Sequence, residues 1–156
     1  MSAAKTSSLG ARADLTAVDL FSGCGGLSRG LKDAGFTVKA AVEIDEKAQA
    51  TYRLNHLDVH LYAKDIRKLD PLAVLKDIGM EVGELDLLAG CPPCQGHSRL
   101  RTRNQRTYVK DSRNNLVADF LRFVKAMNPK TVMLENVPAL GRDQRFTKMR
   151  RQIEAL

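Results

Sequence analysis

The sequence predicts an α/β protein built on a doubly wound, mostly parallel sheet, and three observations support this fold class. Short apolar segments of strand length alternate with longer segments whose apolar residues recur at helical spacing, which is the pattern of successive β-α-β units. The strand-like segments are apolar almost throughout, as expected where helices cover both faces of a sheet. A length of 156 residues with 44% hydrophobic residues suffices for one domain with a buried core.

Five segments are predicted to form parallel strands. In chain order they are residues 15–21, 36–43, 59–63, 85–89 and 131–134. Helices are expected in the gaps between them, and two of these gaps carry clear start signals. Asp45 is the expected N-cap of one helix. Asp70 is the expected N-cap of another, which has Pro71 at its first position and Gly79 just past its end.

Two amphipathic helices are predicted in the last part of the chain. The first runs from about residue 114 to residue 127 and stops at Asn128-Pro129, because the residue before a proline disfavours helix. Its apolar face, which should pack on the sheet, consists of Leu116, Phe120, Val124 and Met127. The second helix has an apolar face formed by Phe146, Met149, Ile153 and Leu156.

The ends and the cysteines of the chain bear on its organisation and its compartment. Residues 1–13 are small, polar and weakly basic, so we expect a flexible extension ahead of a domain at residues 14–156. No apolar run is long enough for a signal peptide or a membrane span, and no membrane partner is expected. The odd set of cysteines, Cys24, Cys91 and Cys94, fits a reducing compartment.

Much of the formal net charge of +7 is concentrated in one long irregular connection at residues 96–113. Its charged residues are Arg99, Arg101, Arg103, Arg106, Lys110 and Arg113, opposed by Asp111. Long loops inside compact domains are usually functional, so this segment is a candidate lid, and a polyanion is the expected partner. A solvated basic surface loop is the plainer alternative.

A glycine-rich turn follows the first predicted strand and leads into a helix. It reads Asp19-Leu20-Phe21-Ser22-Gly23-Cys24-Gly25-Gly26-Leu27. In a doubly wound sheet this turn lies at the carboxyl edge, where a nucleotide-like ligand can approach bare backbone. Glu43, at the end of the second strand, is placed to accept hydrogen bonds from ribose hydroxyls. Together they indicate an adenosine-containing cofactor, with a tight turn and a surface glutamate as the alternative.

Neither common phosphate-binding motif fits this turn. Ser28 stands where the G-x-G-x-x-G pattern, counted from Gly23, requires its third glycine, and no Gly-Lys-Ser/Thr follows as in a P-loop. A cofactor without phosphates, such as S-adenosylmethionine, suits a looser glycine turn.

The fourth predicted strand ends in a cysteine-containing segment, Gly90-Cys91-Pro92-Pro93-Cys94-Gln95-Gly96. Cys91 and Cys94 form a C-x-x-C motif, so a redox pair and half of a zinc site are both alternatives. A zinc site lacks a second paired spacing, and a thioredoxin-like pair should open a helix rather than stand among prolines. A purely structural Cys94 is a further alternative. We favour a reactive Cys94 at the ligand-bearing edge of the sheet, without a metal.

The fifth strand ends in Glu135-Asn136-Val137-Pro138, which adds a carboxylate and an amide at the same edge. By itself such a pair is more often a helix cap. In combination, however, five segments resemble the first through sixth motifs of cytosine-5 DNA methyltransferases, in the family's order. These segments are Asp19 to Leu27, Glu43-Ile44-Asp45, Asp65-Ile66, Pro93-Cys94-Gln95 and Glu135-Asn136-Val137. The resemblance implies a Rossmann-like, S-adenosylmethionine-dependent fold that is incomplete at its carboxy-terminal end, and an enzyme of the restriction-modification kind.

The resemblance also implies a set of cofactor-binding residues. For S-adenosylmethionine they are Phe21, Ser22, Gly23, Cys24, Gly25, Gly26, Leu27, Glu43, Ile44, Asp65, Ile66 and Pro93. The amides of residues 23–27 would meet the methionine end, and Glu43 would hold the ribose. Phe21 and Ile44 would flank adenine, and Asp65 would bind its amino group. Ile44 departs from the aromatic residue that some members have at this position.

In the mechanism that the resemblance implies, the thiolate of Cys94 adds to C6 of cytosine and makes C5 nucleophilic. Glu135 would contact N3 and the exocyclic amine and draw off the charge that addition pushes into the ring. The target is a cytosine flipped out of double-stranded DNA, because a stacked base cannot reach a buried cysteine. Residues expected to contact the nucleic acid or to shape the loop are Gln95, Ser98, Arg99, Arg101, Arg113 and Asn136.

The family's later motifs are not found after Leu140, so we expect a truncated chain or one subunit of a split enzyme that needs a complementary carboxy-terminal subunit. An inactive remnant that at most binds cofactor or nucleic acid is one alternative. A transfer RNA cytosine-5 methyltransferase is another. The expected location is the cytoplasm, with nucleoid association if the source is bacterial.

Overall fold

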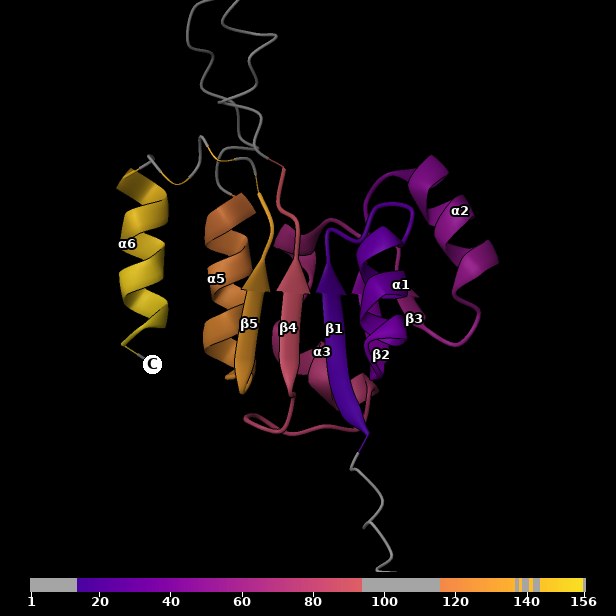
Figure 1. Ribbon diagram of the computed structural model, residues 1–156, viewed down its shortest axis with the longest axis horizontal. Coiled ribbons are helices and arrows are strands. Elements are labelled where there is room, and N and C mark those ends of the chain that lie inside the picture. Colours follow the sequence, from indigo (N-terminus) through magenta and orange to yellow (C-terminus); the bar gives the residue numbers. More distant parts are fainter. Residues whose placement is uncertain (1–13, 94–115, 137, 139–140, 142–143, 156) are drawn as a thin grey trace, which may run out of the picture.

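The computed structural model describes residues 14–93, 116–136, 138, 141 and 144–155. Its strands are β1 (Leu15–Leu20), β2 (Phe36–Val42), β3 (His60–Tyr62), β4 (Leu87–Gly90) and β5 (Thr131–Leu134). They form a parallel sheet in the order β3-β2-β1-β4-β5 (Figure 1). The chain builds outward from β1 in one direction and then returns to place β4 on its other side. The carboxyl ends of β1 and β4 therefore flank the switch point at which ligands bind in doubly wound sheets.

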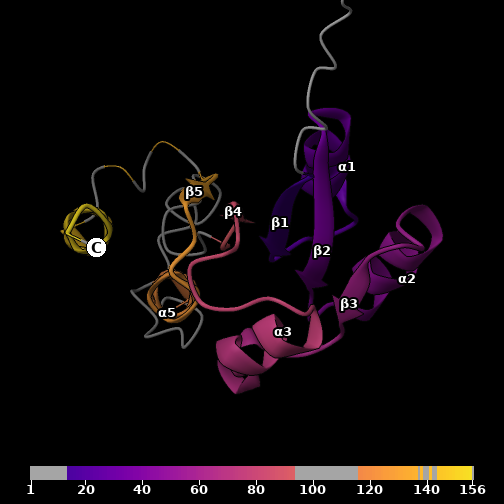
Figure 2. The ribbon, with the colours of Figure 1, turned by 90° about the horizontal axis from the view of Figure 1, so that it is seen from below.

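Helices lie on both faces of the sheet. They are α1 (Gly26–Asp33), α2 (Glu46–Asn55), the 3₁₀ turn η1 (Ile66–Lys68), α3 (Pro71–Asp77), α5 (Leu116–Met127) and α6 (Gln144–Ile153). Figure 2 shows α1 on one face of the sheet, with α3 and α5 on the other. None of the helices in the described ranges is long and apolar enough to cross a membrane.

The core has two parts because side chains along a strand alternate between the faces. Val18 and Leu20 of β1 belong to the larger cluster, which includes Phe120 and Phe123 of α5. Ala17 belongs to the second cluster, with Leu31 of α1 and Tyr52 of α2 as members. By the same alternation Asp19 faces the side of the sheet that α1 covers. Its carboxylate can therefore accept a hydrogen bond from Ser28 of α1.

The predicted fold class and strands are confirmed, and so are two predicted helix starts. The carboxylates of Asp45 and Asp70 each accept a hydrogen bond from an amide of the first helical turn, at 2.8 and 3.0 Å. Gly79 follows α3 with φ +70°, and the amide of Met80 bonds back to the Leu75 carbonyl at 2.9 Å, which is a Schellman ending.

The fourth strand begins two residues later than predicted, at Leu87. The side chain of Asp86 explains the difference. Its Oδ2 accepts both the amide and the hydroxyl hydrogen of Thr16 at 2.8 Å, so a carboxylate takes the place of a backbone partner at the amino edge of the sheet. Lys130 pairs with the other oxygen at 2.7 Å.

Candidate active site

A cavity of about 470 Å³ opens at the carboxyl edge of the sheet. Its walls come from the segments that follow β1, β2, β3 and β4 and from the first residue of α5. The lining residues are Phe21, Val42, Glu43, Ile44, Asp45, Lys64, Asp65, Ile66, Arg67, Cys91, Pro93 and Leu116. This volume lies within the usual range for small-molecule sites.

Phe21 ends β1 with an unusual backbone. Its φ is +61°, in the left-handed region that bulky residues rarely adopt. Such a conformation costs on the order of 1 to 3 kcal/mol and persists where the surrounding structure requires it. Here it stops the strand and places the Phe21 ring in the wall of the cavity.

Glu43 joins two turns at the cavity floor. Its Oε2 accepts the amide hydrogen of Gly23 at 2.8 Å, and its Oε1 accepts the amides of Ile44 and Asp45 at 2.8 and 2.7 Å. The two oxygens of Glu43 thus satisfy three backbone donors from the turns that follow β1 and β2. A carboxylate offers about four lone-pair sites, which leaves acceptor capacity toward the cavity.

Asp65 and Arg67 form a close pair on the wall that follows β3. The Arg67 guanidinium lies across both carboxylate oxygens, with Nη2 2.6 Å from Oδ2 and Nε 2.9 Å from Oδ1. The Arg67 partner lowers the pKa of Asp65, which is therefore ionised at neutral pH. Oδ1 also accepts the amide hydrogen of Arg67 at 3.0 Å, and Nε lies 3.0 Å from Oδ2 as well, so Arg67 already engages both oxygens of Asp65.

A buried polar chain lies beneath the glycine turn. The Ser28 hydroxyl donates to Asp19 Oδ2 at 2.6 Å, so the Tyr52 hydroxyl, 2.7 Å from Ser28, must donate to the serine oxygen. Burial raises the pKa of Asp19 to about 6, and the nearby charge of Glu43 acts in the same direction. Oδ1 of Asp19 and Oγ of Ser22 are buried without a hydrogen-bond partner among the described atoms.

His56 supports the same turn from below. Its Nε2 lies 3.0 Å from the Gly25 carbonyl, so the neutral ring carries its proton on Nε2 and donates it there. Burial and the nearby charge of Lys32 lower the pKa of His56, which keeps the ring neutral. Gly25 has φ +95°, and a Cβ at this position would lie 2.3 Å from His56 Nε2. Only glycine fits between the turn and the histidine.

The ends of β4 and β5 meet beside the cavity. The amide of Glu135 donates to the Gly90 carbonyl at 3.1 Å, and Nδ2 of Asn136 donates to the Pro92 carbonyl at 2.6 Å. Burial, followed by the carboxylate of Glu135, raises the pKa of the Cys91 thiol to about 11. Cys91 is therefore a neutral thiol at physiological pH.

The structure gathers many of the sequence-predicted residues at this edge. Those that line the cavity are Phe21, Glu43, Ile44, Asp65, Ile66 and Pro93. The turn residues Ser22, Gly23, Cys24, Gly25, Gly26 and Leu27 follow Phe21 but are not among the lining residues. Other predicted residues lie outside the described part of the chain, namely Cys94, Gln95, Ser98, Arg99, Arg101 and Arg113.

Sequence reasoning missed several lining residues, namely Val42, Asp45, Lys64, Arg67, Cys91 and Leu116. A signal existed for some of them. Arg67 stands two residues after Asp65, a spacing at which the pair can meet around a single turn. Leu116 is the first residue of α5 and lies at the carboxyl edge of the sheet. The helical spacing of apolar residues predicted only that Leu116 faces the sheet. The buried chain from Tyr52 to Asp19 had no local signal, because its members are 24 and 9 residues from Ser28.

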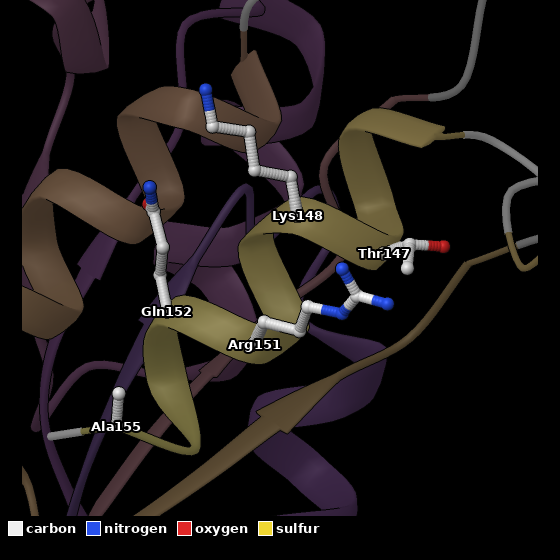
Figure 3. A pocket seen from close by; sticks show the side chains of 5 residues that line it. All are labelled: Thr147, Lys148, Arg151, Gln152 and Ala155. Atoms are coloured by element: carbon white, nitrogen blue, oxygen red, sulfur yellow. The ribbon is translucent and has the colours of Figure 1, made fainter.

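A second, more open hollow lies on α6 and is unrelated to this edge. Its lining residues are Thr147, Lys148, Arg151, Gln152 and Ala155. Figure 3 shows the first four on α6 and Ala155 on the segment that follows the helix. No strand end delivers a polar group to this hollow. Among the described residues, no group of three or more His, Cys, Asp or Glu side chains is arranged to hold a metal ion.

Comparisons with known proteins place the chain in a family. The family model for C-5 cytosine-specific DNA methylase matches residues 15–156. The chain is 42% identical over 137 residues to the type II methyltransferase M.DdeI of Desulfomicrobium norvegicum, which covers 88% of the chain and 31% of that relative. It is 37% identical over 123 residues to M.AgeI of Thalassovita gelatinovora, covering 79% of the chain and 28% of that relative.

A solved structure agrees with the sequence relatives. The crystal structure of a candidate DNA modification methyltransferase encoded within a prophage of E. coli matches with a TM-score of 0.72 at 34% identity. The match covers 90% of this chain and 36% of that one. The chain thus spans about a third of the length of the proteins that it matches.

Proposed function

Because the chain belongs to the C-5 cytosine-specific DNA methylase family, we propose that it forms the cofactor-binding and base-activating part of an enzyme that methylates C5 of cytosine in DNA. One observation carries this proposal. The cavity wall formed by Glu43, Asp65 and Pro93 adjoins the place where Asn136 bonds the Pro92 carbonyl. A cofactor site and the two strand ends expected to activate the base therefore share one edge.

The cavity fits the adenosine part of S-adenosylmethionine. The Glu43 carboxylate accepts three hydrogen bonds and retains capacity for a ribose hydroxyl. The amino group of adenine would approach Oδ2 of Asp65, because Oδ1 already accepts the amide and the Nε–H of Arg67. Phe21 and Ile44 offer apolar surface for the purine, and Ile44 is 60% exposed before any ligand covers it. When bound, the cofactor would supply an electrophilic methyl group on a sulfonium.

The proposed chemistry begins with the Cys94 thiolate forming a bond to C6 of the flipped cytosine. Addition at C6 would convert the former C5–C6 electron pair into that of an enamine with C5 as its nucleophilic end. C5 would take the methyl group as the methyl–sulfonium bond breaks, and the bonding pair would stay on sulfur, which leaves a neutral thioether. Glu135 would hold a proton at N3 and so accept the charge that addition places in the ring. Transfer of the C5 proton to a water molecule would finally expel the Cys94 thiolate from C6 and restore the C5–C6 double bond.

The hydrogen bond from Asn136 to Pro92 supports the assignment of Cys94, because it fixes the backbone two residues before the nucleophile. The state of Cys91 supports it as well. A thiol whose pKa is raised to about 11 carries little thiolate at neutral pH, which makes Cys91 a poor nucleophile.

The proposed substrate is double-stranded DNA, as the names of the family and of the type II relatives suggest. The arginines of residues 96–113 would hold phosphates while this loop closes over the extruded base. We propose that turnover also needs a carboxy-terminal portion, since the chain spans 31% of M.DdeI. An enzyme of this kind works where the DNA is, which in bacteria is the nucleoid region of the cytoplasm.

Covalent trapping tests the assignment of the nucleophile. The chain, co-expressed with the carboxy-terminal portion of a relative, is incubated with cofactor and a duplex containing 5-fluorocytosine, from which the C5 substituent cannot leave. We expect the parent protein and Cys91→Ala to form a denaturation-resistant adduct and Cys94→Ala to form none. An adduct with Cys94→Ala, or its loss in Cys91→Ala, contradicts the assignment.

A further inference from the structure

We infer that Arg122 is a positioning residue of the cofactor cavity, because it fixes the Asp65 and Ile66 segment against α5. The inference rests on the proposed function, since it assumes that this cavity receives the adenosine of the cofactor. Arg122 does not line the cavity and acts through the backbone of the neighbouring segment.

The guanidinium of Arg122 holds two backbone carbonyls. Its Nη1 donates to the Leu69 carbonyl at 2.9 Å and its Nη2 to the Ile66 carbonyl at 2.6 Å. These carbonyls lie at the two ends of the short turn η1, so one rigid fork spans the whole turn. The side chain is 38% exposed, its Nε lies 3.5 Å from Asp119 Oδ1, and its charge lies 5.0 Å from the Phe123 ring centre.

The clamped turn needs support from outside. A three-residue 3₁₀ turn has few internal hydrogen bonds, and here these are the amides of Lys68 and Leu69 bonding to the Asp65 and Ile66 carbonyls at 2.9 and 3.2 Å. Asp65 caps the turn and Ile66 is its first residue, and both also line the cavity. The position of this cavity wall therefore depends on the position of the turn.

A second connection runs through charges. The carboxylate of Asp119 in α5 attracts the Arg67 guanidinium. Asp65, and to a lesser extent Asp119, raise the pKa of Arg67. Arg67 in turn holds both oxygens of Asp65. Arg122 thus fixes the backbone of the turn, while Asp119, which pairs with Arg122, adds only a long-range attraction on Arg67.

The same helix supplies Leu116 to the cavity. Figure 2 shows α5 beside α3 on one face of the sheet, with the turn η1 leading into α3. Because Arg122 and Leu116 belong to one helix, the clamp keeps the Leu116 wall and the Asp65 wall at a fixed separation. We expect this separation to decide how well the purine fits.

The test uses the 156-residue chain and two measurements. Titration of S-adenosylmethionine followed by NMR registers affinities as weak as millimolar, and amide hydrogen exchange reports on residues 67–69 without any ligand. In Arg122→Met we expect faster exchange at residues 67–69 and a dissociation constant raised by about tenfold, the usual effect of losing a hydrogen-bonded support. Arg122→Lys, which keeps the charge but loses the fork, should fall between.

Lys125→Met is the matched control, because it removes a cation from the same helix that contacts Gln152 instead of the turn. It should leave both measurements within about twofold of the parent. A further readout separates positioning from general loosening. A cofactor analogue with oxygen in place of the adenine amino group should lose affinity in the parent chain, and that penalty should shrink in Arg122→Met.

The outcomes separate this inference from the proposed function. If the parent chain binds no cofactor even at millimolar concentration, the cofactor assignment of the cavity fails and the inference fails with it. If the parent binds and the Arg122 variants bind equally well, only the inference is overturned. Unchanged exchange at residues 67–69 also overturns it. Should Arg122→Met not fold, Arg122→Lys decides by the same criteria.

Discussion

At the scale of single residues, the pKa values of two aspartates in this chain are shifted in opposite directions. Asp19 is fully buried with one donor, Ser28, so burial raises its pKa to about 6. Asp86 receives Lys130 and two donors of Thr16, which lower its pKa to about 2. The number of donors and the contact with water decide between these outcomes, and the residue type does not.

The raised pKa of Asp19 predicts a specific dependence of stability on pH. The unfolded carboxyl ionises near pH 3.8 and the folded one near 6, so Asp19 stabilises the fold at low pH and this contribution is lost as pH rises through about 6. The parent therefore loses up to about 3 kcal/mol of unfolding free energy between about pH 4 and pH 7, and Asp19→Asn does not. Chemical denaturation should show the unfolding free energy of Asp19→Asn rising by this amount relative to the parent over that range.

Asp86→Asn is the control for this measurement. Because the pKa of Asp86 is lowered, its contribution is present above about pH 4 and is lost only as pH falls toward 2. The stability difference between this variant and the parent should stay constant from about pH 5 to pH 7. Parallel pH curves for Asp19→Asn and the parent would refute the assignment of Asp19.

At the scale of elements, the turn between β1 and α1 is shaped by what lies beneath it. Gly25 passes over His56, Gly23 donates its amide to Glu43, and Ser28 at the start of α1 joins Asp19 to Tyr52. Each of these glycines is needed for a different structural reason. The spacing of the glycines in the sequence does not show which reason applies at which position.

Two adjacent glycines should respond in opposite ways to alanine. At Gly25 a Cβ would meet His56 at 2.3 Å and the backbone has φ +95°, so Gly25→Ala should lower the free energy of unfolding by more than about 2 kcal/mol. At Gly26, the first residue of α1, an added Cβ would meet no described atom within 4 Å apart from its chain neighbours and the backbone of its own helix. Alanine should therefore be neutral or slightly stabilising there. Urea denaturation of both variants checks this contrast. Equal effects would show that the turn does not rest on His56.

At the scale of the whole molecule, the parallel sheet brings functional groups to one edge. Segments following β1, β2, β3 and β4 line the same cavity, although they are separated in sequence by whole helices. The described residues nevertheless supply only the proposed cofactor cavity and the strand ends beside it. The chain spans about a third of the length of its relatives. Under the proposed function, we expect recognition of the target base to need a portion that corresponds to the part of these relatives that the chain does not match.

This division of labour predicts DNA binding without turnover by the chain on its own. The arginines of residues 96–113 should give weak, sequence-indifferent binding that falls at least about tenfold between about 50 and 200 mM salt. Transfer of tritium from labelled S-adenosylmethionine to mixed-sequence duplex should appear only when a carboxy-terminal portion is co-expressed. Robust methylation by residues 1–156 without it would show that the chain needs no partner.

Local patterns in the sequence determined much of this protein. The alternation of apolar strands and helices determined the sheet, the aspartates Asp45 and Asp70 determined two helix starts, and the motif order determined the family. These features depend on neighbours within a few residues, so they can be read along the chain. Glu43 was expected at the cavity from its place at the end of a strand, because parallel strands deliver their carboxyl ends to one edge. Phe21 and Asp65 were expected there only from the resemblance to the family's motifs.

Only the tertiary structure decided which of these groups act on each other. It placed His56 under Gly25, joined Tyr52 through Ser28 to Asp19, and set the fork of Arg122 on carbonyls that lie 53 and 56 residues away. It also gave Cys91 and Asp19 pKa values that their residue types do not suggest. The physical reason is the same in each case. Burial and long-range hydrogen bonds depend on the distance in space, and the sequence records only the distance along the chain.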